Sequence, residues 1–454
     1  MGIETAGRVP KTVCVIGGGV TGLTAAYRLG KAGYLVTVVE QNPEAGGMLS
    51  SFFTGGSRLE HIYHHIFTSD THVRSLADEL GLEDQIEWYH PRDALLSGRH
   101  LYPFTGPMDL LRFRAIPLWD RIRTGLLVLR AGRMRNFAAL EQQTAADWLH
   151  RQGGRRAYET LWKPLLRAKF DTDAEEVSAV WIWNKFKLRG GSRKGGKGRE
   201  TLGYMRGSFG RMVDRLVEEI GAVGGSVLTR TTALDISKRE NGGYAVTCIL
   251  EDCSARTLSC DAVVACIAGR QFANIAGALR LPREYLEKVT SVTHKANLCL
   301  TLRMYHPLTD FYWTTICDSL PFVVMVEHTN LTGTGPYRGA VVYLSRYLGI
   351  TDPLWTCTDD DIYRLFCGEL DRILPSFSSS QVIEWRVRRT RYAQPVVLRD
   401  YGQRVAGIDT PDPGVKLAGM AQIYPQDRGV NYAIALAGRA ASAVEAYLEE
   451  KPES

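Results

Sequence analysis

A glycine-rich turn near the N-terminus carries the clearest chemical signal in the sequence. It fits the pattern G-x-G-x-x-G, with Gly17, Gly19, Val20, Thr21 and Gly22 as its members. Glycines at these places permit a tight turn, let the backbone approach a pyrophosphate and allow a strand and a helix to pack closely. Glu40 follows at about the ~20-residue spacing of a carboxylate that holds a ribose diol and repels a 2′-phosphate. The pattern predicts a dinucleotide site that disfavours NADP. A glycine-rich turn that binds nothing is the alternative.

The densest group of titratable side chains is Glu60-His61-Ile62-Tyr63-His64-His65. A histidine with a pKa near neutrality can take or return a substrate proton, so His64 and His65 are candidate catalytic residues. Neighbours on a strand point to opposite faces, so at most one of the two faces a given site. Alternatively, both hydrogen-bond a cofactor or nearby backbone. A metal bound by these histidines and Glu60 is possible by ligand type, but we expect none.

A second polar group, Glu327-His328-Thr329-Asn330, follows the apolar run VVMV. Polar residues at the end of such a strand can reach into a cleft, so Glu327 and His328 are also candidate catalytic residues. The alternative is an ordinary polar strand end. Lys295 is more simply explained as an exposed lysine at the start of a strand than as a catalytic group, since lysines are mostly surface residues.

The elements that must position these residues alternate in the manner of an α/β protein. A strand at 11–16, a helix at 20–32 with Gly33 after it, and a strand at 34–40 predict one βαβ unit around the glycine turn. Amphipathic helices are expected between 75 and 150. A second α/β stretch begins near Gly207, with a helix at 209–223, a strand at 226–235 and a buried strand at 261–267. A strand at 415–420 and a helix at 432–450 close the chain, and the glycine- and lysine-rich stretch at 189–199 predicts a surface loop.

Both ends of the chain resemble one known superfamily. Residues 13–51, with a Gly-Gly pair after the acidic residue, and residues 417–441 are similar to the FAD-dependent amine oxidase, protoporphyrinogen oxidase and UDP-galactopyranose mutase superfamily. HIYHHIFTSD (61–70), LWKPLLRAKF (161–170), LGYMRGSFGRMVDRL (202–216) and RYAQPVV (391–397) resemble a bacterial protoporphyrinogen-oxidase-like subgroup of NAD(P)/FAD-dependent oxidoreductases.

This resemblance implies that the dinucleotide is FAD, and it assigns further residues to the cofactor. Besides the glycine turn and Glu40, they are Gln41, Gly46, Gly47, Met48, Leu49, Ala233, Leu234, Gly419, Met420, Arg428, Asn431, Tyr432 and Ala433. Arg428 could instead hold a substrate anion or pair with Asp427. His64 or His65 would stand at the reactive face of the flavin. Relatives that oxidise amines place a lysine near the flavin, and the sequence around Lys295 is loosely similar to theirs.

The resemblance also implies an α/β fold, with a Rossmann-type (GR2-like) FAD-binding domain and an inserted α+β substrate domain. The FAD-binding domain would comprise residues 1–75, 201–280 and 401–454. The substrate domain would comprise a helical part at 76–200 and a sheet at 281–400.

The implied function is an FAD-dependent oxidoreductase, an oxidase or dehydrogenase that moves hydride from a C–H bond to flavin N5. Its substrate would be a small or medium organic molecule, such as a sugar, a nucleotide-sugar or a secondary-metabolite intermediate. Two alternatives stay open: a non-redox, flavin-dependent nucleotide-sugar mutase or isomerase, and, more remotely, a non-catalytic escort-type carrier.

The composition and the distribution of charge limit the compartment and the partners that we expect. Nine scattered cysteines without a C-x-x-C indicate a reducing compartment, and no signal peptide or bilayer-crossing stretch is visible, so we expect a cytoplasmic protein. The net charge of +6 is mild, but arginines crowd 112–135. That segment predicts contact with a membrane surface, guidance of an anionic substrate, or a solvated helix face. No nucleic-acid motif accompanies these charges, and the sequence does not determine the oligomeric state.

Overall fold

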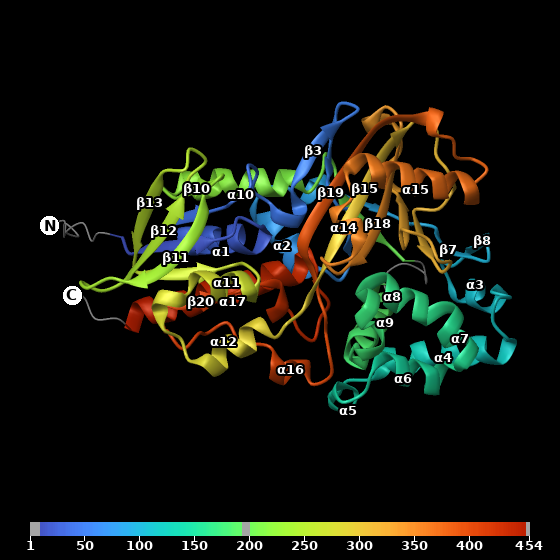
Figure 1. Cartoon of the computed structure of the whole chain (residues 1–454), viewed down its shortest axis with the longest axis horizontal. Coiled ribbons are helices and arrows are strands. Elements are labelled where there is room, and N and C mark those ends of the chain that lie inside the picture. Colours follow the sequence, from blue (N-terminus) through green and yellow to red (C-terminus); the bar gives the residue numbers. More distant parts are fainter. Residues whose placement is uncertain (1–9, 193–199, 451–454) are drawn as a thin grey trace.

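A parallel five-stranded sheet is assembled from three distant stretches of the chain in the computed structural model, which describes residues 10–192 and 200–450. Its order is β10-β2-β1-β14-β20. The strands are β1 (Thr12–Ile16), β2 (Leu35–Val39), β10 (Ser226–Leu228), β14 (Ala262–Ala265) and β20 (Val415–Leu417). Their apolar side chains are largely buried, as expected for a parallel sheet covered on both faces. In Figure 1 the strands are blue, green and red side by side, so both ends of the sequence meet here.

Three helices belong to this sheet: α1 (Val20–Lys31), α10 (Gly210–Ala222) and α17 (Val430–Glu450), and α1 contacts the other two. The helix α1 begins directly after Gly19, whose backbone is extended, and it is followed by Gly33 at φ +92°. A glycine tolerates that left-handed conformation without a Cβ clash, so it ends the helix at low cost. The βαβ unit predicted around the glycine turn is confirmed.

Smaller sheets and helices extend this lobe. An antiparallel sheet comprises β11 (Thr232–Lys238), β12 (Tyr244–Ile249) and β13 (Ala255–Cys260), and α11 (Gly269–Ile275) and α12 (Arg283–Thr290) follow it. The pair β3 (Ser51–Thr54) and β4 (Ser57–Glu60) continues the chain after Gly46-Gly47. A third small sheet, in the order β5-β9-β6, is built from β5 (Ile66–Phe67), β9 (Leu202–Met205) and β6 (Ile86–Tyr89), with α2 (Thr71–Glu79) between β5 and β6 in sequence.

A seven-stranded mixed sheet forms the second lobe, in the order β19-β15-β18-β17-β16-β7-β8. Its strands are β15 (His294–Met304), β16 (Trp313–Ile316), β17 (Val324–Glu327), β18 (Ala340–Leu348), β19 (Val382–Pro395), β7 (Asp93–Ser97) and β8 (His100–Pro103), and α15 (Asp359–Ile373) packs against β19. The strands β6, β7 and β8 lie within 75–150, where the sequence predicts helices alone. They have only four or five residues each, too few for an alternating pattern to stand out.

A helical unit completes the second lobe and lies beside the sheet, in teal and green in Figure 1. Its main helices are α3 (Pro107–Arg112), α4 (Leu118–Arg133), α6 (Ala145–Gly153), α8 (Lys163–Phe170) and α9 (Ala179–Ser192). The helix α9 extends into the stretch predicted as a loop at 189–199, and residues 193–199 lie outside the described residues. The α/β fold with a Rossmann-type domain and an inserted α+β region is confirmed. The domain boundaries stay a prediction.

Candidate functional site

The glycine turn between β1 and α1 forms a cradle in which Gly17 and Gly22 leave no room for a side chain. A Cβ on Gly22 would lie 1.9 Å from the carbonyl oxygen of Gly17, and a Cβ on Gly17 would lie 2.7 Å from that of Cys266. Gly17 also has φ +105°, a conformation that L side chains rarely adopt. The first amides of α1 follow directly, and free N–H groups at a helix N-terminus attract an anion. This geometry fits the pyrophosphate of a dinucleotide.

The second glycine pair lies against the first. The Gly46 amide donates to the Gly18 carbonyl at 2.7 Å, and a Cβ on Gly47 would come within 3.1 Å of the Gly19 Cα. Glu40 is buried beside them, where its Oε2 accepts from the Gly18 amide at 2.7 Å. Its Oε1 accepts from the Asn42 backbone amide at 2.8 Å. A carboxylate has room for further donors, so Glu40 can still accept a ribose hydroxyl.

The other residues assigned to the cofactor differ in their exposure and in their contacts with the protein. Leu49 is buried, whereas 46% of Leu234 is exposed on β11. Gly419 follows β20, and a Cβ there would lie 2.3 Å from the Ile267 carbonyl oxygen. The side-chain oxygen of Asn431 accepts from the backbone amides of His72 and Val73, so it joins α17 to α2. Remaining neighbours are Gln41, Met48, Ala233, Met420, Tyr432 and Ala433, and their contacts with FAD stay a prediction.

His64 is within the electrostatic reach of Lys169 and Arg428, and one of its ring nitrogens has no partner among the described residues. Its Nδ1 lies 2.7 Å from the Ile62 carbonyl oxygen, and a carbonyl can only accept, so Nδ1 carries the proton and Nε2 holds a lone pair. Burial, together with the charges of Arg428 and Lys169, lowers the His64 pKa to about 4. His64 is therefore neutral at physiological pH and can accept a hydrogen bond or a proton at Nε2.

The other two histidines of the segment have different surroundings. His65 Nδ1 lies 2.9 Å from the Tyr312 hydroxyl, and its ring meets Phe67, Tyr312 and Trp313 edge-on. The ring of His61 stacks on Phe52. Within the part of the chain that the structure describes, no group of three or more His, Cys, Asp or Glu side chains could hold a metal ion.

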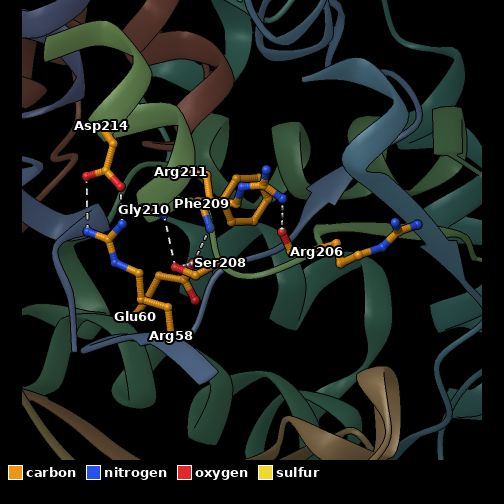
Figure 2. A network of polar contacts seen from close by, with 8 residues as sticks. All are labelled: Arg58, Glu60, Arg206, Ser208, Phe209, Gly210, Arg211 and Asp214. Carbon is orange, nitrogen blue, oxygen red and sulfur yellow. Dashed lines mark hydrogen bonds and ion pairs between the residues drawn. The ribbon is translucent and has the colours of Figure 1, made fainter. Parts of the chain in front are cut away.

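Glu60 holds the turn that leads into α10. Its carboxylate accepts from the Tyr204 hydroxyl at 2.8 Å. It also accepts from the Ser208 hydroxyl at 2.7 Å and from the Phe209 amide, and Arg58 pairs with Asp214 nearby (Figure 2). The exposed fraction of Glu60 is 0%, and burial raises its pKa. Because every contact is made to protein groups of that turn, Glu60 has a structural role.

Glu327 and His328 point apart, as expected for neighbours at a strand end. Glu327 accepts from the backbone amides of Leu308 and Thr309 and from the Thr309 hydroxyl. His328 Nε2 lies 3.0 Å from the Tyr337 hydroxyl, and burial lowers its pKa to about 3. Both side chains are 1% exposed. Their hydrogen bonds are made within the second lobe. Contact of either side chain with a substrate stays a prediction.

Lys295 is buried rather than exposed, contrary to the sequence-based expectation. Its ammonium nitrogen lies 2.9 Å from Asp173 and from the Thr172 hydroxyl, so it pairs with the helical unit. Arg428 does not pair with Asp427. It donates from Nε to Gln394 at 2.8 Å and from Nη2 to the Tyr347 hydroxyl, and its Nη1 lies 3.8 Å from the Met48 sulfur.

Lys169 and Tyr347, both near Arg428, were not among the residues selected from the sequence. Lys169, on α8, places its ammonium nitrogen 4.7 Å from the ring centroid of Tyr347, on β18. Lys169 lies in the stretch 161–170 that carried the resemblance, but a single lysine on an amphipathic helix has no pattern that distinguishes it from a surface residue. Only the fold brings it beside Arg428.

The fold and the glycine cradle define a dinucleotide-binding protein of the Rossmann type. The model of the flavin containing amine oxidoreductase family matches residues 20–444, so the chain belongs to that family, and its cofactor is FAD. Three similarities are representative. The chain is 22% identical over 258 residues to a probable zeta-carotene desaturase of Synechococcus elongatus, covering 52% of this chain and 53% of the relative. It is 25% identical to protoporphyrinogen oxidase 2 of Arabidopsis thaliana over 44% of each chain.

Among solved structures, cyclohexylamine oxidase from Brevibacterium oxydans aligns with a TM-score of 0.72 and 17% identity, covering 97% of this chain and 100% of that one. At this identity the likeness shows the fold alone. The chain spans about half the length of the curated relatives that it matches.

Proposed function

We propose that this protein is an FAD-dependent oxidase or dehydrogenase that oxidises a C–H bond of a small or medium organic substrate. One observation carries the proposal: the chain runs from Gly46-Gly47 through β3 and β4 to His64, which is within the electrostatic reach of Lys169 on α8 and of Arg428 in the loop before α17. Sugars, nucleotide-sugars and secondary-metabolite intermediates are the substrates we consider, and the electron acceptor is oxygen or another oxidant.

Each part of the chain has a distinct role in this proposal. Bound FAD supplies a hydride acceptor at flavin N5. The glycine turn and Glu40 hold the pyrophosphate and ribose ends of the cofactor. His64 accepts a hydrogen bond from a substrate O–H or N–H at Nε2 and can take its proton as the neighbouring C–H bond is oxidised. Of the two histidines selected from the sequence, His64 is favoured over His65, because its Nε2 has no partner among the described residues.

Anaerobic mixing of the FAD-loaded protein with candidate substrates tests this proposal. We expect a substrate to bleach the flavin absorption near 450 nm, and His64→Asn to slow that bleaching by about 10²-fold while FAD stays bound. His61→Asn, in the same segment, is the matched control and should leave the rate unchanged. Unchanged kinetics in His64→Asn would remove this residue from the reaction. Turnover that requires prior chemical reduction of the flavin would instead favour the nucleotide-sugar mutase.

We also propose that α3 and α4 dock on an anionic membrane surface. The outer stripe of α4 is apolar: Leu118, Trp119, Ile122, Leu126 and Leu129 are 59%, 67%, 39%, 46% and 58% exposed. Its inner stripe, Thr124, Leu127 and Ala131, is buried. A helix face that is merely solvated is polar, so the second apolar stripe requires another explanation.

Charge complements this apolar stripe. Residues 107–135 contain seven arginines and two aspartates, and Met108 and Leu111 on α3 are also exposed. An apolar face bordered by arginines is typical of helices that lie in the interface of anionic lipids. Among the described residues, no helix is long and apolar enough to cross a bilayer. The proposed contact is therefore with the surface of the membrane.

A further inference from the structure

A group of three cations surrounds Asp427, and two of them are within electrostatic reach of His64. The group is built from elements far apart in sequence. Lys169 comes from α8, Lys185 from α9, and Arg428 from the loop before α17. The Lys169 ammonium lies 4.7 Å, and the Arg428 guanidinium carbon 5.5 Å, from the ring centroid of Tyr347. Arg428 also donates to the Tyr347 hydroxyl. Two cations therefore share one aromatic ring inside the protein.

The carboxylate among these cations is already committed. Asp427 is 5% exposed and pairs with Lys185 at 2.5 Å. It also accepts from the Trp181 indole N–H at 2.9 Å and from the Gln394 amide at 3.4 Å. Within residues 10–188 and 200–450, no carboxylate forms a hydrogen bond or ion pair with Lys169 or Arg428. The charge of Asp427 also acts on Lys169 and Arg428, so one carboxylate faces three cations and the group keeps an excess of positive charge.

Excess positive charge is costly in a partly buried site. Burial, with Arg428 and Lys185 nearby, lowers the pKa of Lys169 well below its usual value, although the charge of Asp427 acts in the opposite direction. An anion placed against Lys169 would have the opposite effect, because opposite charge favours the protonated ammonium. The site is therefore suited to a ligand that brings its own negative charge.

The same cations lie beside a residue assigned to the cofactor and within electrostatic reach of a candidate catalytic histidine. Arg428 contacts the sulfur of Met48, directly after the Gly46-Gly47 pair. After burial, the charges of Arg428 and Lys169 are what lower the pKa of His64, so His64 is within their electrostatic reach. A molecule held by Lys169 and Arg428 would lie within a similar electrostatic reach of His64.

We propose that Lys169 and Arg428 bind a carboxylate or phosphate group of the substrate, so that this protein oxidises an acid rather than an amine. The inference rests on the proposed function, since it names the substrate class of the same site. A protonated amine would meet two cations here and be repelled. In this respect the chain differs from what the name of its structural neighbour, cyclohexylamine oxidase, indicates for that protein.

Three probes with one ring and different charge test the proposal by binding alone. Benzoate, benzyl alcohol and benzylamine are titrated into the FAD-loaded protein, and the visible flavin spectrum reports occupancy. We expect benzoate to bind at least about tenfold more tightly than benzylamine, because a charge-assisted hydrogen bond contributes roughly that factor. Inorganic phosphate should compete with benzoate if a phosphate is the natural group. Benzylamine binding as tightly as benzoate would overturn the proposal.

Variants of two lysines on one helix make the test specific. Lys169→Met should weaken benzoate about tenfold or more and leave benzyl alcohol unchanged, and Lys169→Arg should retain most of the benzoate affinity. Lys163→Met is the control, since Lys163 pairs with Glu159 on the outside of α8. If Lys169→Met loses FAD, or binds benzoate as the wild type does, Lys169 does not hold the substrate and the proposal fails.

Proton uptake gives a readout that a merely structural lysine would not move. Calorimetry of benzoate binding in two buffers of different ionisation enthalpy should show protons taken up by the wild type, because the bound anion raises the pKa of Lys169. The uptake should disappear in Lys169→Met, and uptake that persists there would contradict the assignment. If a neutral substrate bleaches the flavin and benzoate does not bind, the inference fails while the proposed function stands. If benzoate binds through Lys169 but no substrate reduces the flavin, the proposed function fails alone.

Discussion

At the scale of single residues, burial decides which titratable groups remain available for chemistry. His64 and His65 are identical as sequence letters, but the fold turns one toward Arg428 and the other into a ring cluster around Tyr312. Sequence reasoning selected both and expected at most one of them to face a given site. The surroundings that distinguish them, Arg428 for His64 and Tyr312 for His65, lie more than two hundred residues away in the sequence.

Glu327 offers a pH test at this scale. Burial raises its pKa from 4.5 to about 7. The folded state thus binds this proton more tightly than the unfolded chain. The stabilisation is complete below about pH 4.5 and is lost as the pH rises through about 7. The shift corresponds to up to about 3 kcal/mol. We expect the melting temperature of the wild type to fall by about 2–3 °C more than that of Glu327→Gln between pH 5 and pH 8.

The control for this pH test is Glu284→Gln, on the exposed side of α12, which should melt in parallel with the wild type. Parallel melting of Glu327→Gln and the wild type would mean that Glu327 ionises normally. The side chain would then have to be in contact with water.

At the scale of elements, the sequence was most informative where one pattern covers a whole unit. The segment from Thr12 to Val39 combines a buried strand, a glycine turn, a helix and a second strand, and each signal agrees with the others. The strands β7 and β8 were missed because they are short and find their stability in pairing with each other and with β16. Lys169 was missed for a similar reason, since its function depends on β18 and on the loop before α17.

The outer face of α4 predicts a measurable affinity for lipid. Vesicles that contain phosphatidylglycerol should sediment the wild type, and vesicles of phosphatidylcholine alone should do so more weakly, because each arginine near an anionic surface contributes about 1 kcal/mol. Trp119→Glu combined with Leu126→Glu should reduce binding at least about tenfold, since each large side chain contributes roughly 1.5–3 kcal/mol on burial.

A glutamate introduced on a different surface is the control for the loss of vesicle binding. Leu365 is 41% exposed on α15, and Leu365→Glu should sediment as the wild type does. Equal sedimentation of the double variant and the wild type would mean that another surface contacts the membrane, or none does. Loss of binding at high salt with the apolar residues intact would show that the arginines initiate the contact.

At the scale of the whole molecule, the site is assembled from layers that come from different stretches of the chain. The glycine cradle belongs to the parallel sheet, His64 to the segment after β4, and Lys169 to the helical unit. No single stretch of sequence contains the site. Its geometry therefore depends on contacts that fix the helical unit against the seven-stranded sheet.

Lys295 is such a contact, and it gives the last prediction. It reaches from β15 to Asp173, at 2.9 Å, and to Asp171, at 3.6 Å, both just after α8. Removing one partner of a buried pair costs about 3–5 kcal/mol. We expect Lys295→Met to cost less, about 2 kcal/mol, because the two aspartate side chains remain 22% and 38% exposed and can be hydrated. The variant should melt earlier than the wild type and lose benzoate affinity as Lys169 shifts.

Adding Asp173→Asn should recover part of the lost stability, since it removes one of the carboxylates left without a partner. The flavin spectrum without ligand should not change in either variant, because the glycine cradle lies in a different sheet. A marked spectral change on Lys295→Met alone, with normal melting, would instead place this lysine next to the flavin. Its ion pair with Asp173 would then have to open when FAD binds, and the helical unit would have to move away from β15.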